Sequence, residues 1–166
     1  GYKTVGINHL GDWGTQFGKM ICAFKRWGNR EEVERGGVAA LSELYVRFHQ
    51  EEEKHPELEE EGRAWFKRIE DGDEEALSLF TWFKELTLRD TDRVYKLLGV
   101  TFDSYAGESF YNDKMQPVID TLREKGLLEE SKGAMVVNLE PYDMPPCLIL
   151  KADGATLYAT RDLAAA

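Results

Sequence analysis

The chain has 166 residues, of which 42% are hydrophobic and 31% charged, a balance typical of a soluble globular domain. Its formal net charge of −10 disfavours direct nucleic-acid binding, because phosphate contacts require Lys and Arg side chains. We expect no membrane span and no secretory leader. Because Cys22 and Cys147 form no CxxC pattern, we also expect two free buried thiols in the cytoplasm.

The first 28 residues predict a strand, a glycine-containing loop and a helix. Residues 2–7 form a β-branched run that predicts a short strand. Glycines in the loop 8–14 let the backbone approach a ligand, and apolar residues from Phe17 to Phe24 recur at helical spacing before Gly28. This order is half of a doubly wound unit, in which ligands bind at the carboxyl ends of strands.

Residues 31–99 predict helices that face a common core. Pro56 marks a break inside the acidic run 51–61, which lacks the alternation of a calcium loop and is better interpreted as a solvated face. The remaining apolar residues recur every three or four positions, as on the buried side of helices. The predicted stripes are Leu41, Leu44, Tyr45 and Phe48; Leu58, Trp65, Phe66 and Ile69; and Ala76, Leu79, Phe80, Phe83 and Leu86, continued by Val94, Leu97 and Leu98.

The pattern becomes mixed after Gly99. Residues 100–103 predict a strand, and an amphipathic helix follows from Met115 to Leu122, ended by Gly126. Residues 135–139 predict another strand before a proline-rich loop. Strand and helix regions on both sides of a long helical stretch predict an α/β fold of mixed type, with a nucleotide-binding scaffold interrupted by a largely helical insertion.

The last eighteen residues, 149–166, predict a strand, a turn, a second strand and the start of a helix. Asp153-Gly154 between two apolar runs is a strong hairpin signal, because a tight primed turn needs positive φ at its centre. Thr160 is a plausible N-cap, and the alanines after it favour a helix.

Tyr158 and Asp162 are the candidate binding residues in this segment. They are four positions apart at a strand-to-helix junction, so a phenol and a carboxylate can face one cavity. A carboxylate binds a planar guanidinium through a fork of charge-assisted hydrogen bonds, and an aromatic ring or hydroxyl can hold the same group. An acid in the first turn of a helix is also common for purely structural reasons, so the spacing alone leaves both interpretations open.

Three blocks of this sequence resemble arginyl-tRNA synthetases, which are class I aminoacyl-tRNA synthetases. They are residues 8–18, residues 98–111 and residues 151–164, in the order in which they occur in that family. In the family, the Tyr and the Asp of the third block contact the guanidinium of arginine, and they match Tyr158 and Asp162 here. The resemblance covers both ends and the middle of the chain.

The resemblance implies an internal fragment of the catalytic domain of an arginine–tRNA ligase. Residues 1–28 and 141–166 would belong to a Rossmann-like nucleotide-binding domain, and residues 29–140 to its connective insertion. The parent enzyme would activate arginine with ATP and Mg²⁺ and transfer it to tRNA(Arg). Because this piece is acidic, we expect little direct tRNA contact from it, and we expect no membrane partner.

The chain lacks the family's motifs for ATP. The run from His9 to Asp12 resembles the His-x-Gly-His motif but ends in Asp, and no Lys-Met-Ser-Lys-Ser-type loop or other phosphate loop is present. We therefore expect no catalytic residue, no metal ligand, no bound cofactor and no adenylation activity in the fragment alone. Candidate residues at the rim of the arginine pocket are Asn8, His9, Asp12, Trp13 and Gln16. A lone His in a loop, such as His9, more often makes a structural hydrogen bond than takes part in catalysis, and Trp13 fits a packed core equally well.

Two other functions fit the same features. One is a stand-alone module that binds arginine without catalysis. The other is a helical interaction domain whose acidic face binds a basic partner, with an affinity that falls as salt is added.

Overall fold

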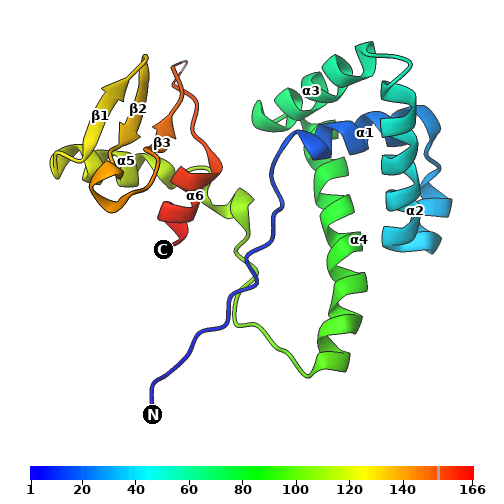
Figure 1. The fold of residues 1–166 in the computed structure, drawn as a ribbon. Helices are drawn as coiled ribbons and strands as arrows, with labels where there is room; N and C mark the ends of the chain where they lie inside the picture. The colour runs from blue at the N-terminus through cyan, green and yellow to red at the C-terminus, as the bar shows by residue number, and fades with distance from the viewer. Residues whose placement is uncertain (153) are drawn as a thin grey trace. The chain divides into compact units, whose positions relative to one another are not determined.

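The computed structural model describes residues 1–152 and 154–166. The chain divides into two compact units (Figure 1). Residues 13–101 form one, which we call the helical unit, and residues 1–12 with 102–166 form the other, the sheet unit. Each unit has its own buried side chains.

The helical unit contains four α-helices in chain order, as the apolar spacing predicts. Two of these helices have an N-cap residue whose side chain accepts backbone N–H groups. Asn29 Oδ1 accepts those of Glu31 and Glu32 at the start of the second helix, and Asp73 Oδ1 accepts that of Ala76 at the start of the fourth. The helices are α1 (Thr15–Trp27), α2 (Arg30–Glu52), α3 (Glu57–Glu70) and α4 (Glu74–Leu98).

The core of the helical unit is built from the predicted stripes. Every helix contributes buried apolar side chains, and rings from α1 and α4 pack edge to face. Helix α1 lies unusually close to α3, because a Cβ added at Gly18 would collide with the carbonyl oxygen of Gly62. The buried residues include Ile21, Val33, Leu41, Phe48, Leu58, Ile69, Ala76, Phe83 and Leu86.

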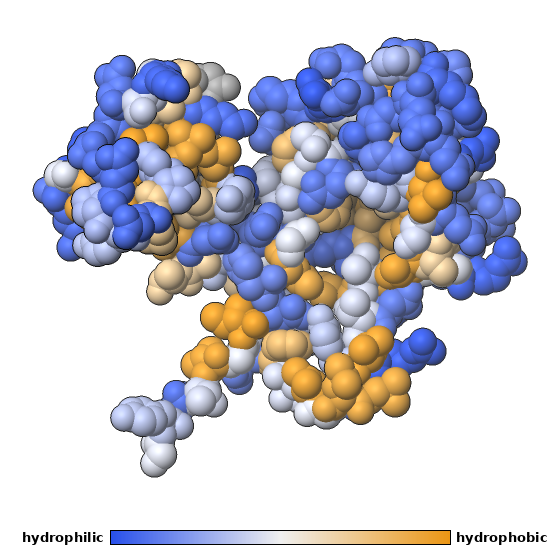
Figure 2. Space-filling model, viewed as in Figure 1, coloured by the Kyte–Doolittle hydropathy of each residue, from blue (hydrophilic) through white to orange (hydrophobic). Residues whose placement is uncertain are grey.

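The last turns of α4 are not part of this core. Val94, Leu97 and Leu98 were expected to continue the buried stripe, but they are 47%, 82% and 69% exposed. The buried positions of α4 end at Leu86, because the helix extends past the helices that cover its first half (Figure 1). Hydrophobic surface is visible at this end of the helix in Figure 2.

Helix α2 is broken near its start. Gly37 has φ 58° and ψ −139°, which are not helical values and are accessible chiefly to glycine. Asp90 of α4 accepts the N–H of the next residue, Val38, at 2.8 Å. The carboxylate therefore satisfies a donor that the break leaves without its helical partner, and it ties α4 to the second part of α2.

The two cysteines lie in different environments. Cys22 is fully buried in the helical unit, and burial raises the pKa of its thiol to about 11. Cys147 of the sheet unit is half-buried, so the expectation of two buried thiols holds for Cys22 only, because Cys147 begins an edge strand. Both thiols are free.

The sheet unit contains one antiparallel sheet with strand order β1-β2-β3. Lys132 and Gly133 connect the first two strands and have φ 52° and 80°, the positive values that a tight primed hairpin turn needs. The strands are β1 (Leu128–Ser131), β2 (Ala134–Val137) and β3 (Cys147–Leu150); the helices are α5 (Met115–Glu124) and α6 (Tyr158–Ala165), and the short 3-10 helices are η1 (Glu108–Tyr111) and η2 (Glu140–Tyr142).

Two of the predicted strands do not form. Residues 2–7 and 100–103 belong to no strand, and in this region only Ile7 and Ser104 make a bridge, which is isolated and parallel. The N–H of Gly6 donates to the Asp103 carboxylate at 2.8 Å, so a side chain takes the place of the backbone acceptor that would extend a ladder. Among the described residues this bridge is the only parallel pairing, and a Rossmann-like sheet is not confirmed.

The predicted hairpin near the carboxyl end is shorter than expected. Asp153 lies outside the described residues, and the second strand is reduced to one bridge between Leu150 and Thr156. The N–H of Lys151 donates to the carbonyl of Ala155 at 2.9 Å, and α6 already begins at Tyr158. Too few residues separate the turn from the helix for a second strand to form.

Thr160 does not cap α6, contrary to the prediction. The N-cap is Leu157, and Thr160 lies in the first turn of the helix, fully buried. Its hydroxyl donates to the carbonyl oxygen of Ile149 at 2.6 Å. The hydroxyl that suggested a cap instead attaches α6 to β3.

Candidate functional site

Tyr158 and Asp162 lie on the same side of α6. They are separated by one helical turn, and both are open to solvent: Tyr158 is 70% exposed and the Asp162 side chain 59%. The opposite side of α6 packs against α5, η1 and β3, and buried Thr160 fixes its position on β3. The helix therefore presents a phenol and a carboxylate on one exposed face.

His9 is the predicted rim residue that lies next to this pair. Its Nε2 is 3.9 Å from Asp162 Oδ1, and its Nδ1 is 3.3 Å from the carbonyl oxygen of Ala106. Since a carbonyl oxygen only accepts, Nδ1 is the donor in this hydrogen bond, and Nε2 is the ring nitrogen that faces the carboxylate. The ring centroid of His9 is also 5.8 Å from that of Tyr111. The structure thus brings His9 and Asp162 together from distant parts of the sequence.

The loop that carries His9 is held along the segment that leads into η1. The N–H of Asn8 donates to the carbonyl of Ser104 at 2.9 Å, and the N–H of Glu108 donates to the carbonyl of Leu10 at 2.9 Å. These bonds on both sides of His9 set the register between the two segments. Asn8 thereby has a backbone role beside the site.

Asp12 is buried, with 4% of its surface exposed. Its Oδ1 accepts the N–H of Ser109 at 2.8 Å and its Oδ2 accepts the hydroxyl of the same residue at 2.7 Å. Both carboxylate oxygens are therefore engaged inside the sheet unit.

Trp13 and Gln16 belong to the helical unit. The ring of Trp13 packs edge to face against Phe66 and Phe80, with centroid distances of 5.3 and 5.9 Å. Gln16 Nε2 donates to the carbonyl of Trp13 at 3.1 Å. The packing of Trp13 favours the core interpretation over a place at the rim. For both residues, a role at the rim stays a prediction.

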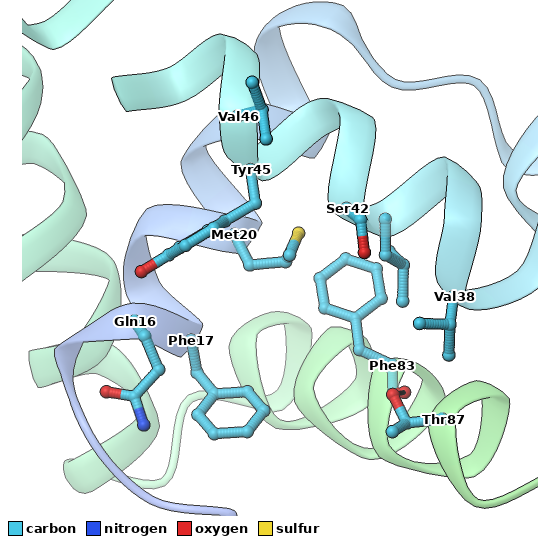
Figure 3. A pocket seen from close by; sticks show the side chains of 10 residues that line it. Gln16, Phe17, Met20, Val38, Ser42, Tyr45, Val46, Phe83 and Thr87 are labelled. Atoms are coloured by element: carbon cyan, nitrogen blue, oxygen red, sulfur yellow. Dashed lines mark hydrogen bonds between the residues drawn. The ribbon is translucent and has the colours of Figure 1, made fainter. Parts of the chain in front are cut away.

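The helical unit also contains a cavity of about 540 Å³ (Figure 3). Its walls come from α1, α2 and α4 and include Phe17, Met20, Tyr45 and Phe83. No acidic or basic side chain lines it, so it offers no counter-charge to a guanidinium or a phosphate. We therefore assign the candidate site to the exposed face of α6.

Three residues near this face were not singled out by sequence reasoning. Tyr111 contacts the His9 ring, Ser109 holds Asp12, and Asn112 Oδ1 accepts from Arg161 Nε at 2.9 Å. Tyr111 and Ser109 lie in the block 98–111 and Asn112 directly follows it, so the block predicts their region but not their contacts. Within the described part of the chain, no cluster of His, Cys, Asp or Glu is suited to a metal ion.

Comparison with known proteins covers the whole chain. The family model for "tRNA synthetases class I (R), catalytic domain" matches residues 1–166. Arginine–tRNA ligases of Exiguobacterium sibiricum and Clostridioides difficile are 64% and 63% identical over 166 residues, which are 100% of this chain and 30% and 29% of those proteins. The crystal structure of arginyl-tRNA synthetase from Plasmodium falciparum is similar with a TM-score of 0.78 and 25% identity, over 98% of this chain and 27% of that chain.

The chain thus spans about 30% of the length of the curated relatives that it matches. No helix in the described residues combines the length and the apolar character that crossing a membrane requires.

Proposed function

Because the chain belongs to the family of class I arginyl-tRNA synthetase catalytic domains, we propose that it supplies the side-chain recognition site of an arginine–tRNA ligase. The parent enzyme would activate arginine with ATP and transfer it to tRNA(Arg). Tyr158 and Asp162 would bind the guanidinium, and this piece would contribute no catalytic group. The match over the whole chain does not favour a stand-alone arginine-binding or acidic interaction module.

The observation that carries this proposal is the exposed pair on α6. The only side-chain partner of the Asp162 carboxylate in the described part of the chain is His9, at a distance longer than a hydrogen bond. Its acceptor positions are therefore available for a fork of two guanidinium N–H groups. Tyr158, one turn away, offers a ring face and a hydroxyl to the same planar cation.

Among the predicted rim residues, His9 has the strongest structural support. Its Nε2 points to the carboxylate that would bind the ligand, so it can border the guanidinium. Asn8 supports His9 through its backbone, whereas Trp13 and Gln16 remain proposed rim residues on the basis of the sequence block alone.

We further propose a Rossmann-like domain, residues 1–28 and 141–166, interrupted by a connective insertion, residues 29–140. Support comes from the discontinuous sheet unit, whose two chain segments flank the helical residues 13–101. The compact units differ from the proposed boundaries at both ends. Helix α1 joins the helical unit because it packs closely against α3 through Gly18 and Gly62, and residues 102–140 of the proposed insertion belong to the sheet unit.

The remaining partners follow from the family. We propose ATP and Mg²⁺ as cofactors of the parent enzyme in the cytoplasm, with no residue of this chain assigned to them, since it lacks the family's ATP motifs. With a net charge of −10, this piece would make little direct contact with tRNA.

The test is Asp162→Asn in the full-length protein that contains this chain. The amide keeps the shape but removes the charge and replaces one acceptor by a donor, so we expect the arginine KM to rise at least about tenfold. The ATP KM should change by less than about twofold, because the loss is confined to the arginine side chain. Steady-state pyrophosphate exchange with varied arginine or ATP measures both.

Asp143→Asn is the matched control. Asp143 is exposed in the same unit and has φ 56°, a conformation that Asn also tolerates well. The control should leave both KM values unchanged. Equal rises of the arginine and ATP KM values in Asp162→Asn would reject the assignment.

A further inference from the structure

We propose that Asp12 is a positioning residue for arginine binding, which acts through the 106–111 turn to hold His9 beside Asp162. This inference rests on the proposed function of Tyr158 and Asp162. It changes the role of Asp12 from a rim residue that faces the ligand to a buried residue that orders the rim.

The first step is the attachment of Asp12 to η1. Its carboxylate binds a single residue twice, through the N–H and the hydroxyl of Ser109, which is 97 positions away in sequence. With 4% exposure, the carboxylate is shielded from water, which would otherwise compete for both bonds. The pair therefore joins the loop that follows His9 to the start of η1.

The second step is the close fit of the turn around this carboxylate. Gly107 is buried, and a Cβ added there would lie 2.7 Å from both Asp12 Oδ1 and the carbonyl oxygen of Leu10. The turn can therefore approach the loop only with glycine at this position. The N–H of Glu108 donates to the same Leu10 carbonyl at 2.9 Å, which fixes the turn on the other side of Gly107.

The third step leads from the turn to the ligand-binding face. The turn carries the Ala106 carbonyl, which accepts from His9 Nδ1, and the Tyr111 ring, which lies against the His9 ring and is 9% exposed. Both contacts determine the orientation of the imidazole. His9 Nε2 is then directed to Asp162 Oδ1 at 3.9 Å.

A carboxylate suits Asp12 better than an amide would. Ser109 presents two donors, its N–H and its hydroxyl, and only a carboxylate accepts with both of its ends. In Asp12→Asn the amide oxygen still accepts the N–H, and the serine hydroxyl can rotate to accept from the new NH₂ group. This variant should therefore keep much of the attachment, whereas Asp12→Ala loses it.

The experiment compares Asp12→Ala, Asp12→Asn and Ser109→Ala in the full-length protein. For Asp12→Ala we expect a rise of about tenfold in the arginine KM, with kcat and the ATP KM within about twofold. The reason is that the variant loses the contacts that position His9 but keeps the groups that take part in the reaction. Asp12→Asn should restore most of the arginine KM. Ser109→Ala keeps the backbone hydrogen bond, so it should raise the arginine KM by less, about threefold. This variant provides the test if Asp12→Ala does not fold.

The matched control is Asp113→Asn, which removes an exposed carboxylate just after η1 that pairs with Lys114, and it should leave the arginine KM unchanged. In an Asp162→Asn background, Asp12→Ala should raise the arginine KM by less than about twofold, because coupled residues are not additive. A purely structural role would lower the active fraction and kcat without a selective change in the arginine KM.

The outcomes separate the two proposals. If Asp162→Asn raises the arginine KM and neither Asp12→Ala nor Ser109→Ala does, the positioning role is wrong and the recognition site stands. Additive effects in the double variant would also overturn it. If Asp162→Asn has no effect on the arginine KM, the recognition site itself is wrong and the role of Asp12 fails with it.

Discussion

The two units of this molecule are stabilised in different ways. In the helical unit, four amphipathic helices bury large apolar side chains such as Phe48, Phe83 and Ile21. In the sheet unit, individual hydrogen bonds join separate segments: Asp12 binds Ser109, 97 positions away, and Thr160 attaches α6 to Ile149 of β3. The strands of its sheet are only four residues long.

This difference indicates where each unit tolerates change. Burial of apolar area is not directional, so the helical unit can accept similar hydrophobic side chains at many positions. Hydrogen bonds in the sheet unit depend on the geometry of individual atoms, and a buried carbonyl or carboxylate that loses its partner is costly. The candidate site lies on the unit whose parts are positioned by such bonds.

The largest expected effect is on the helical core. Phe83→Ala removes a ring that is 2% exposed and packs against Phe24 at 5.6 Å, so it should lower the free energy of unfolding of this unit by about 4 kcal/mol. All four tryptophans, at positions 13, 27, 65 and 82, lie in the helical unit. Denaturation of residues 1–166 followed by tryptophan fluorescence therefore reports on this unit selectively.

Leu97→Ala on the same helix is the control. Leu97 is 82% exposed, so its truncation should change the unfolding free energy by less than about 0.5 kcal/mol. A loss comparable to that of Phe83→Ala would mean that the end of α4 is packed in solution, which would contradict the boundary of the core described above.

The helical unit could be predicted well because its signal is local. Periodic apolar residues, Pro56 and the glycine after α1 determine where helices begin and end. The exposed end of α4 was not predictable, because periodicity shows which side of a helix is apolar but not how far its neighbours extend along it. The break at Gly37 depends on Asp90, which lies 52 positions beyond Val38.

The sheet unit was predicted less well because its signals are not local. The strand β2 and the helix α5 follow from their own residues, but the failure of residues 2–7 to form a strand depends on the Asp103 side chain. At the site, the spacing of Tyr158 and Asp162 predicts a shared face of α6. The neighbouring position of His9 and the burial of Asp12 depend on residues 104–111, which spacing alone does not connect to them.

An intermediate effect is expected from one hydroxyl of the sheet unit. Thr160→Val keeps the shape of a fully buried side chain but removes the donor to the Ile149 carbonyl at 2.6 Å. We expect the opening free energy of this unit to fall by about 2 kcal/mol, because the carbonyl remains buried without that partner. Amide hydrogen exchange of β2 and β3 measures it, since the sheet unit contains no tryptophan.

Thr121→Val tests whether the effect of Thr160→Val depends on the burial of its hydrogen bond. The hydroxyl of Thr121 also donates to a backbone carbonyl, that of Pro117 at 2.8 Å, but on the exposed side of α5. Water replaces this bond, so the change should stay below about 0.5 kcal/mol. Equal effects of the two variants would remove the proposed link between burial and the stability of the sheet unit.

The smallest effect concerns a polar contact in the helical unit. Lys19 Nζ of α1 is 2.6 Å from Glu52 Oε1 of α2, with both side chains 18% exposed, and His49 Nδ1 is 3.0 Å from Glu52 Oε2. Burial acts to raise the pKa of Glu52, but the hydrogen bonds and charges of Lys19 and His49 together outweigh it, so the pKa lies below its usual value. A lowered pKa means that this carboxylate stabilises the fold when it is ionised.

Glu52→Gln should therefore be destabilising by about 1 kcal/mol at pH 7 and by progressively less below about pH 4.3, the usual pKa of an unfolded Glu. The contribution disappears as the pH falls through the lowered pKa of the folded state, where the native carboxylate also becomes neutral. Denaturation monitored by tryptophan fluorescence at pH 7 and pH 3 measures the difference. Glu59→Gln, which removes an exposed partner of Arg63, should have no measurable effect at either pH. If Glu52→Gln were equally destabilising at both pH values, its effect would come from side-chain packing, and the helical unit would owe nothing measurable to this ion pair.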